Sequence, residues 1–156
     1  MLFRSNIASS IASLATNARK ISGITVTDGT VQSPAVITMT AAQITTLGSK
    51  LTGNYSVSLS DAITAAQVAT TLASNTKISS VAVSDTAANI ASSIASLATN
   101  ASKISGITVT DGTVQSPAVI TMTAAQITTL GSKLADRKST RLNSSHSQQS
   151  RMPSSA

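Results

Sequence analysis

The sequence predicts an α/β protein built as a solenoid of stacked strand–helix repeats, with a parallel sheet on one side and helices on the other. Three observations predict this fold class. Residues 6–51 recur as residues 89–134, with Arg19 replaced by Ser102 as the single change. Four short segments alternate apolar and small polar residues with period 2, which indicates half-buried strands. Between them, apolar residues recur at helical spacing.

The long repeat has an offset of 83 residues and contains three short strand–helix units. This predicts a non-repeat start at residues 1–4, a repeat array over residues 5–135 and a tail at residues 136–156. A compact, doubly wound α/β domain is the alternative. It would force two nearly identical segments into different environments, which argues against it. A pure β-solenoid is a weaker alternative, because the alanine-rich helical stripes oppose it.

The strands are expected within residues 23–28, 56–61, 80–85 and 106–111, and a second short strand is expected after Pro34 and after Pro117. In a strand, alternate residues face the same side. The residues expected to face one side together are Ile24, Val26, Val57, Leu59, Val81, Val83, Ile107 and Val109.

Three helical stripes lie between the strands. The first comprises Ile90, Ile94, Leu97, Ala98 and Ala101. The second comprises Val68 and Leu72, with Ala65 and Ala69 beside them. The third comprises Ile44, Leu47 and Leu51, repeated as Ile127, Leu130 and Leu134. Ser and Thr, which make up about a third of the chain, are only moderate helix formers, so packing is expected to supply most of the stability.

The charges follow the same period. There is no Glu, and four of the five acids stand at the end of a predicted strand: Asp28, Asp61, Asp85 and Asp111. Asp61 and Asp85 are expected to act as helix N-caps, whereas the Gly that follows Asp28 and Asp111 favours a turn. Thr40 and Thr123 are expected to cap the next helix. Lysines stand where the helices end and complement the helix dipole: Lys20, Lys50, Lys77, Lys103 and Lys133.

Two patterns are candidate binding sites. The four aspartates are calcium candidates, but one carboxylate per unit is a thin supply for a cation that takes six to eight oxygen ligands, so capping and turn formation are the preferred interpretation. The outward residues Thr25-x-Thr27, Thr38-x-Thr40, Thr108-x-Thr110 and Thr121-x-Thr123 resemble the flat faces of ice-binding solenoids. Ser58-x-Ser60 and Ala82-x-Ser84 interrupt that array, and Thr is a common strand former.

Composition argues against several function classes. The chain has no Cys and one His, His146, which lies in the predicted tail. It therefore lacks the parts of a Cys-based metal site or a His-based triad. Aromatic residues make up 1% of the chain, too few for a stacking platform on nucleic acid. No apolar run approaches the ~20 residues of a membrane span. We expect no enzyme, no cofactor, no nucleic-acid partner and no membrane insertion.

The tail differs from the array. After Leu134 the repeat would continue with Thr-Gly-Asn-Tyr, as at residues 52–55, but the sequence departs from it. Residues 137–146 resemble a translated sequencing or cloning adaptor. A natural basic tail without a fold of its own is the alternative. The tail carries four bases and one acid, which is half of the formal net charge of +6. The basicity of the chain is therefore weak support for binding to nucleic acid.

The segments 81–90, Val-Ala-Val-Ser-Asp-Thr-Ala-Ala-Asn-Ile, and 37–44, Ile-Thr-Met-Thr-Ala-Ala-Gln-Ile, resemble tandem repeats of very large bacterial secreted or surface proteins. Such arrays often accompany haemolysin-type, repeats-in-toxin calcium-binding regions. The resemblance implies an extracellular, adhesin-like stalk. We expect a structural repeat segment whose partners are neighbouring repeats and which self-associates end to end. The alternative is a binding module that uses the Thr-rich face or the Asp turns for glycan, calcium or ice.

Overall fold

The computed structural model describes residues 3–113 and 115–134. Within them, the α-helices are α1 (Arg4–Thr16), α2 (Ala41–Leu47), α3 (Val68–Ser74), α4 (Ala87–Thr99) and α5 (Ala124–Leu130). The strands are β1 (Ile24–Val26), β2 (Ala35–Met39), β3 (Leu51–Gly53), β4 (Tyr55–Ile63), β5 (Ile78–Asp85) and β6 (Ile104–Val109). Short 3₁₀ helices are η1 (Ala18–Lys20), η2 (Ala65–Gln67), η3 (Ala101–Lys103) and η4 (Gly131–Lys133). The predicted tail at 136–156, with His146, lies outside the described residues.

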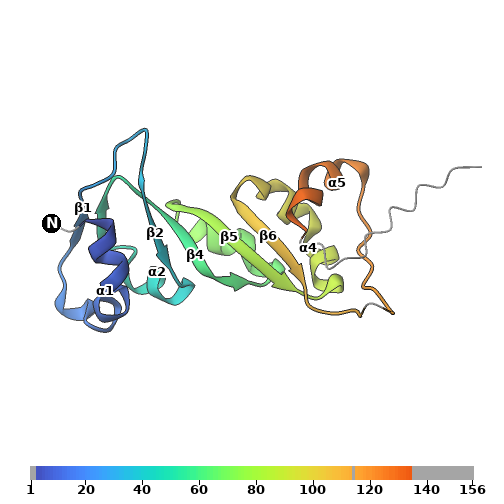
Figure 1. The fold of residues 1–156 in the computed structure, drawn as a ribbon, viewed down its shortest axis with the longest axis horizontal. Helices are drawn as coiled ribbons and strands as arrows, with labels where there is room; N and C mark the ends of the chain where they lie inside the picture. Colours follow the sequence, from blue (N-terminus) through green and yellow to red (C-terminus); the bar gives the residue numbers. More distant parts are fainter. Residues whose placement is uncertain (1–2, 114, 135–156) are drawn as a thin grey trace, which may run out of the picture.

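Every strand pair is parallel, and the strands follow one another in chain order. The larger sheet has the order β2–β4–β5–β6, and β1 pairs with β3. Asn54 alone separates β3 from β4, so these two strands form one long line beside which β1 and β2 both lie. The segment between β1 and β2 stands out from the body (Figure 1). The predicted α/β class with a parallel sheet is confirmed.

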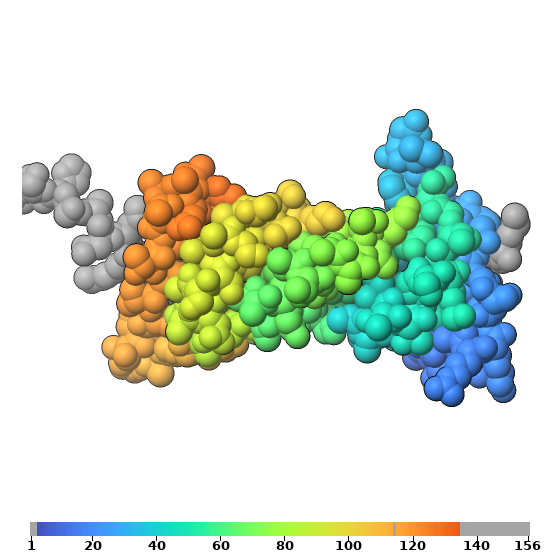
Figure 2. All heavy atoms as spheres, turned by 180° about the vertical axis from the view of Figure 1, so that it is seen from behind, coloured from blue at the N-terminus to red at the C-terminus, as the bar shows by residue number. Residues whose placement is uncertain are grey.

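The chain advances along the long axis of the molecule. In Figure 1, α1, β1 and β2 lie at one end, β4 and β5 in the middle, and β6 and α5 at the other end. Figure 2 shows the same order from behind, as successive bands of sequence. We call each strand line a layer: β1 with β2, then β3 with β4, then β5, then β6. The two copies of the long repeat place α1 and α4 at the same offset of 83 residues, and likewise α2 and α5.

The core forms between the inward strand residues and the helices. Of the eight residues predicted to face one side, seven are buried and Val109 is half-buried. The stripe of α4 is also confirmed, because Ile90 and Leu97 are fully buried and Ile94 and Ala98 pack against the core. In the second stripe, Val68, Leu72 and Ala65 are buried, whereas Ala69 is exposed. The alternation of strand residues thus identified buried residues in every layer, and the helical stripes identified others.

Threonines are the N-caps of α2, η2, α4 and α5, whereas Phe3 stands at that position before α1. Thr40 and Thr123 accept a hydrogen bond from the backbone N–H of Gln43 and Gln126 and form complete capping boxes, as predicted. The helices that follow Asp61 and Asp85 are capped by Thr64 and Thr86. The prediction that the two aspartates are the N-caps was therefore wrong. The aspartates precede the caps by three residues or one, and their carboxylates take other partners, described below.

Two further predictions were wrong. Leu51 does not continue the helix of Ile44 and Leu47, because α2 ends at Leu47 and Leu51 begins β3. Its counterpart Leu134 forms an isolated parallel bridge with Ile107. The strand expected after Pro34 is present as β2, but residues 118–122, which have the same sequence, are not in a strand. β2 pairs with β4, and no corresponding strand borders residues 118–122 within the described part of the chain.

None of the helices in residues 3–113 and 115–134 has the length and apolar character that crossing a membrane requires.

Candidate functional site

The four aspartates form one recurring contact between layers. Each carboxylate accepts a hydrogen bond from the first backbone N–H of the helix that precedes its own layer. The contacts are Asp28 Oδ1 to Arg4 N at 3.0 Å, Asp61 Oδ1 to Ala41 N at 2.9 Å, Asp85 Oδ2 to Ala65 N at 3.0 Å and Asp111 Oδ1 to Ala87 N at 2.7 Å. The partners lie 20 or 24 residues apart. Each aspartate thus joins one unit to the next.

Electrostatics favours this arrangement. The first N–H groups of a helix lack partners within the helix and carry the positive end of its dipole, so a carboxylate there is stabilising. Asp85 is the most buried of the four, at 9% exposed. The hydrogen bond from the Asn89 side chain, followed by that from the Ala65 backbone N–H, holds the pKa of the Asp85 carboxyl below its ordinary value, although burial opposes this. The Asp85 carboxyl therefore stays ionised to a lower pH than an ordinary aspartate, because its pKa is lowered.

Asp28 also forms an ion pair with Arg4. The Arg4 Nε lies 3.5 Å from Asp28 Oδ2, and the Arg4 side chain is 58% exposed. Exposed ion pairs contribute little to stability. In the second copy, Ala87 stands at the position of Arg4, and Asp111 keeps the backbone contact without the ion pair. The contact with the helix N–H is therefore the feature that the repeats share.

The structure does not bring the calcium candidates together in one cluster of ligands; these candidates are Asp28, Asp61, Asp85 and Asp111. Within residues 3–113 and 115–134, no group of three or more acidic, His or Cys side chains is placed to hold a metal ion. Each aspartate belongs to a separate contact with a helix N–H, as described above. A calcium ion requires six to eight oxygen ligands, which one carboxylate does not supply. Calcium binding remains a hypothesis for these residues.

The lysines lie at the opposite ends of the strands from the aspartates. Lys20, Lys103 and Lys133 close 3₁₀ helices, as the dipole argument predicts. Lys50 Nζ donates to the Ile21 carbonyl at 2.9 Å, and Lys77 Nζ lies 5.2 Å from the centre of the Tyr55 ring. Each layer therefore begins after a lysine, whereas the places of the aspartates vary: Asp28 stands between β1 and β2, Asp61 lies within β4 and Asp85 ends β5.

Hydroxyl groups on the strands make a second set of contacts between layers, which the sequence reasoning missed. Ser79 Oγ donates to the Val57 carbonyl at 3.1 Å, and Ser105 Oγ donates to the Val81 carbonyl at 3.0 Å. In both cases a serine one residue after the start of a strand binds the backbone of the preceding layer. The signal was available in the sequence, because a Ser or Thr follows the first strand residue at 52, 79 and 105.

The residues of the predicted Thr faces are exposed, apart from the half-buried Thr40, but the faces do not stack on one another. Thr25 stands opposite Thr52, with a hydroxyl–hydroxyl hydrogen bond of 3.2 Å. Thr38 stands opposite Ser58, and Thr108 stands opposite Ser84. Thr121 and Thr123 are exposed outside any strand. The outer face is therefore a mixture of small hydroxyl residues rather than an unbroken Thr array.

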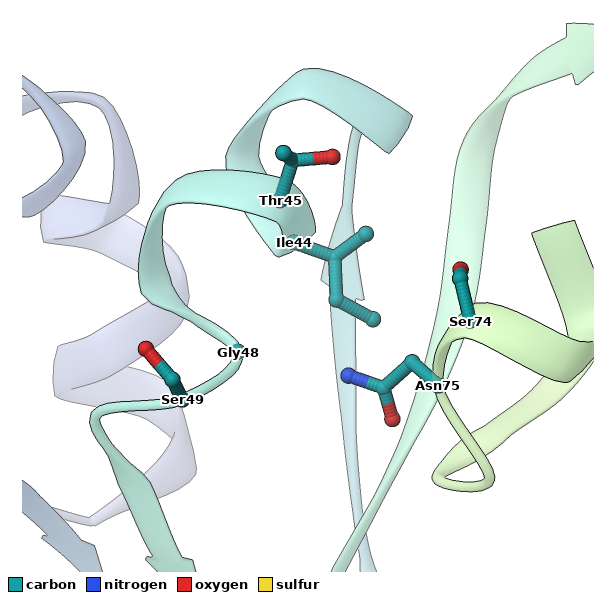
Figure 3. A pocket seen from close by; sticks show the side chains of 6 residues that line it. All are labelled: Ile44, Thr45, Gly48, Ser49, Ser74 and Asn75. Carbon is teal, nitrogen blue, oxygen red and sulfur yellow. The ribbon is translucent and has the colours of Figure 1, made fainter.

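A small cleft lies between the ends of α2 and α3 (Figure 3). It measures about 260 Å³ and is lined by Ile44, Thr45, Gly48, Ser49, Ser74 and Asn75. A Cβ on Gly48 would come within 2.8 Å of Asn75 Nδ2, so glycine permits the close approach of the two units here. No ionisable side chain lines the cleft, and it provides no acid, base or activated nucleophile for catalysis.

Comparison with protein-family models finds no family that matches the chain, and neither a search of curated proteins nor one of solved structures returns a match.

Proposed function

We propose that this chain is a structural repeat segment, a spacer or stalk of stacked strand–helix units within a larger bacterial extracellular or surface protein, without catalysis. The recurrence of the Asp-to-helix contact is the observation that carries this proposal. It joins four successive pairs of units in the same way. The four aspartates thus supply the same polar contact between units along the whole described chain, which suits an array of stacked repeats.

The solenoid form of the fold belongs to this proposal. In a solenoid each unit contacts only its neighbours, and the strand order β2–β4–β5–β6 follows the chain accordingly. The two copies also share the aspartate contact, because the backbone N–H groups of Arg4 and Ala87, at equivalent positions, donate to the equivalent Asp28 and Asp111. A compact α/β domain, the alternative, would not require this equivalence. The extracellular location rests on the resemblance of residues 37–44 and 81–90 to bacterial surface repeats.

Small-angle scattering on chains with one, two and three copies of the 83-residue repeat tests the proposal. β6 lies three layer spacings from β1, and neighbouring strands lie about 4.8 Å apart. Each added repeat should therefore lengthen the particle by about 14 Å at constant cross-section. A compact domain would instead widen in all directions, with a radius of gyration that grows as about the 0.38 power of length. That outcome would refute the spacer.

A further inference from the structure

The two copies of the long repeat have equivalent end faces that are covered to different degrees. Ile44 in α2 is 6% exposed, whereas Ile127 at the same place in α5 is 53% exposed. Val36 is 49% exposed, whereas Val119 is 80% exposed. The local sequences are identical, and both helices begin with the same capping box. The difference in exposure therefore comes from the neighbouring unit and not from the sequence of the copy.

In the first copy, the cover is the unit formed by residues 51–75. Its strand β4 pairs with β2 in the register Ala35↔Tyr55 to Met39↔Leu59. Its Ser74 and Asn75 lie across the cleft from Ile44 (Figure 3). One strand–helix unit thus covers both the strand edge and the helix face of the first copy.

The second copy has the beginning of the same arrangement. Leu134 bridges Ile107 in parallel, which repeats the pairing of Leu51 with Ile24 at the first residue of β3. The next layer therefore starts in the register of the first copy. Beyond it, the edge of residues 118–122 and the exposed side of α5 have no covering unit among the described residues. We call this surface, defined by Val119, Ile120, Met122 and Ile127, the open face.

We propose that the open face docks a further strand–helix unit of the 51–75 type, following in the same array. An exposed sheet edge beside apolar side chains is a template for strand addition, and residues 118–122, although not in a strand, have the sequence of β2. The docked strand would pair with residues 118–122 in the register of Tyr55 with Ala118 and Leu59 with Met122. A whole second copy of the chain cannot offer its own β4, because β2 and β5 already flank that strand. This inference rests on the proposed function, and it identifies the kind of unit that binds the open face.

Cysteine probes test this inference cleanly, because the chain has no Cys of its own. Ile127→Cys reports on the open face, and Ile44→Cys is the matched control in identical sequence. In the chain as it stands, the thiol of Ile127→Cys should react with a soluble disulfide reagent about tenfold faster than that of Ile44→Cys, because burial limits access. Equal rates, or a slow Ile127→Cys in a chain that sediments as a dimer, would overturn the proposal.

An extended chain then supplies the unit. A copy of residues 52–88 is joined after Leu134, and the rate of Ile127→Cys should fall to within about threefold of Ile44→Cys. The control extension carries Val57→Asp and Leu59→Asp in the appended copy and should leave the rate high. A fast rate in an extended chain whose circular dichroism shows the added helix would refute docking.

The free peptide of residues 51–78 provides a second route if the extension does not fold. Added to the chain as it exists, it should slow Ile127→Cys in a saturable way and leave Ile44→Cys unchanged. No slowing at millimolar peptide would count against the proposal. The inference and the proposed function can be refuted separately. If added repeats lengthen the particle at constant cross-section but the thiol of Ile127→Cys still reacts fast, the spacer function is supported and docking at the open face is refuted.

Discussion

The paired substitutions Ile44→Ala and Ile127→Ala separate burial from local sequence. Both residues occupy the fourth position of a seven-residue helix with the same sequence and cap. The change to Ala improves helix propensity by about 0.4 kcal/mol at either site. The removal of a buried Ile side chain costs about 3 kcal/mol, which applies in full to Ile44 at 6% exposed. Ile127, at 53% exposed, should lose only about 1.3 kcal/mol of burial.

The net losses in unfolding free energy are therefore about 2.6 kcal/mol for Ile44→Ala and about 0.9 kcal/mol for Ile127→Ala. With a urea dependence of about 1.5 kcal/mol per molar, the midpoint should fall by about 1.7 M and about 0.6 M. Circular dichroism during urea unfolding measures both shifts. Equal shifts would refute the reasoning, because they would mean that the neighbouring unit at residues 51–75 does not determine the packing of this helix.

Four further predictions follow from the same contacts. Asp61→Asn removes the charge at the start of α2 and should lower the unfolding free energy by about 1 kcal/mol in urea, and an unchanged midpoint would contradict the contact with Ala41. The pKa of the Asp85 carboxyl is lowered in the folded protein. Its contribution to stability is therefore complete above the ordinary value of 3.8 and is lost as the pH falls through the folded pKa. Urea midpoints measured from pH 2 to 6 should show this loss for the unchanged chain and not for Asp85→Asn. Millimolar calcium should leave the melting temperature unchanged, and an upward shift would support the calcium hypothesis instead. The mixed outer face should not slow ice recrystallisation, and clear inhibition would favour the binding module.

The strands and their buried faces were predictable because their signal is local. Alternation of apolar and small residues specifies which side of a strand faces the core, and Val57, Val81 and Ile107 are fully buried as that pattern requires. The threonine caps were predictable for the same reason, since Thr40 and Gln43 lie three residues apart and satisfy each other. Both features were identified from residues that lie only a few positions apart in the sequence.

The partners of the aspartates were not predictable from a local window. Asp61 and Asp85 stand just before a helix, where an N-cap is plausible, yet their carboxylates bind Ala41 and Ala65, which lie 20 residues earlier. A periodic clue existed in the sequence. The distance from the start of a helix to the next aspartate is either 20 or 24 residues throughout. To recognise it, one would have had to compare the spacing between the start of a helix and the aspartate of the next unit, rather than the pattern within one unit.

Residues 35–39 and 118–122 show most directly where local reasoning ends. They share one sequence and therefore one strand propensity, but only the first is a strand, beside β4. A strand needs a partner for its backbone N–H and C=O groups, and that partner belongs to the next unit. Secondary structure in such a chain is thus a property of two adjacent units. Since Leu134 already repeats the pairing of Leu51, we expect one more docked unit to make residues 118–122 a strand.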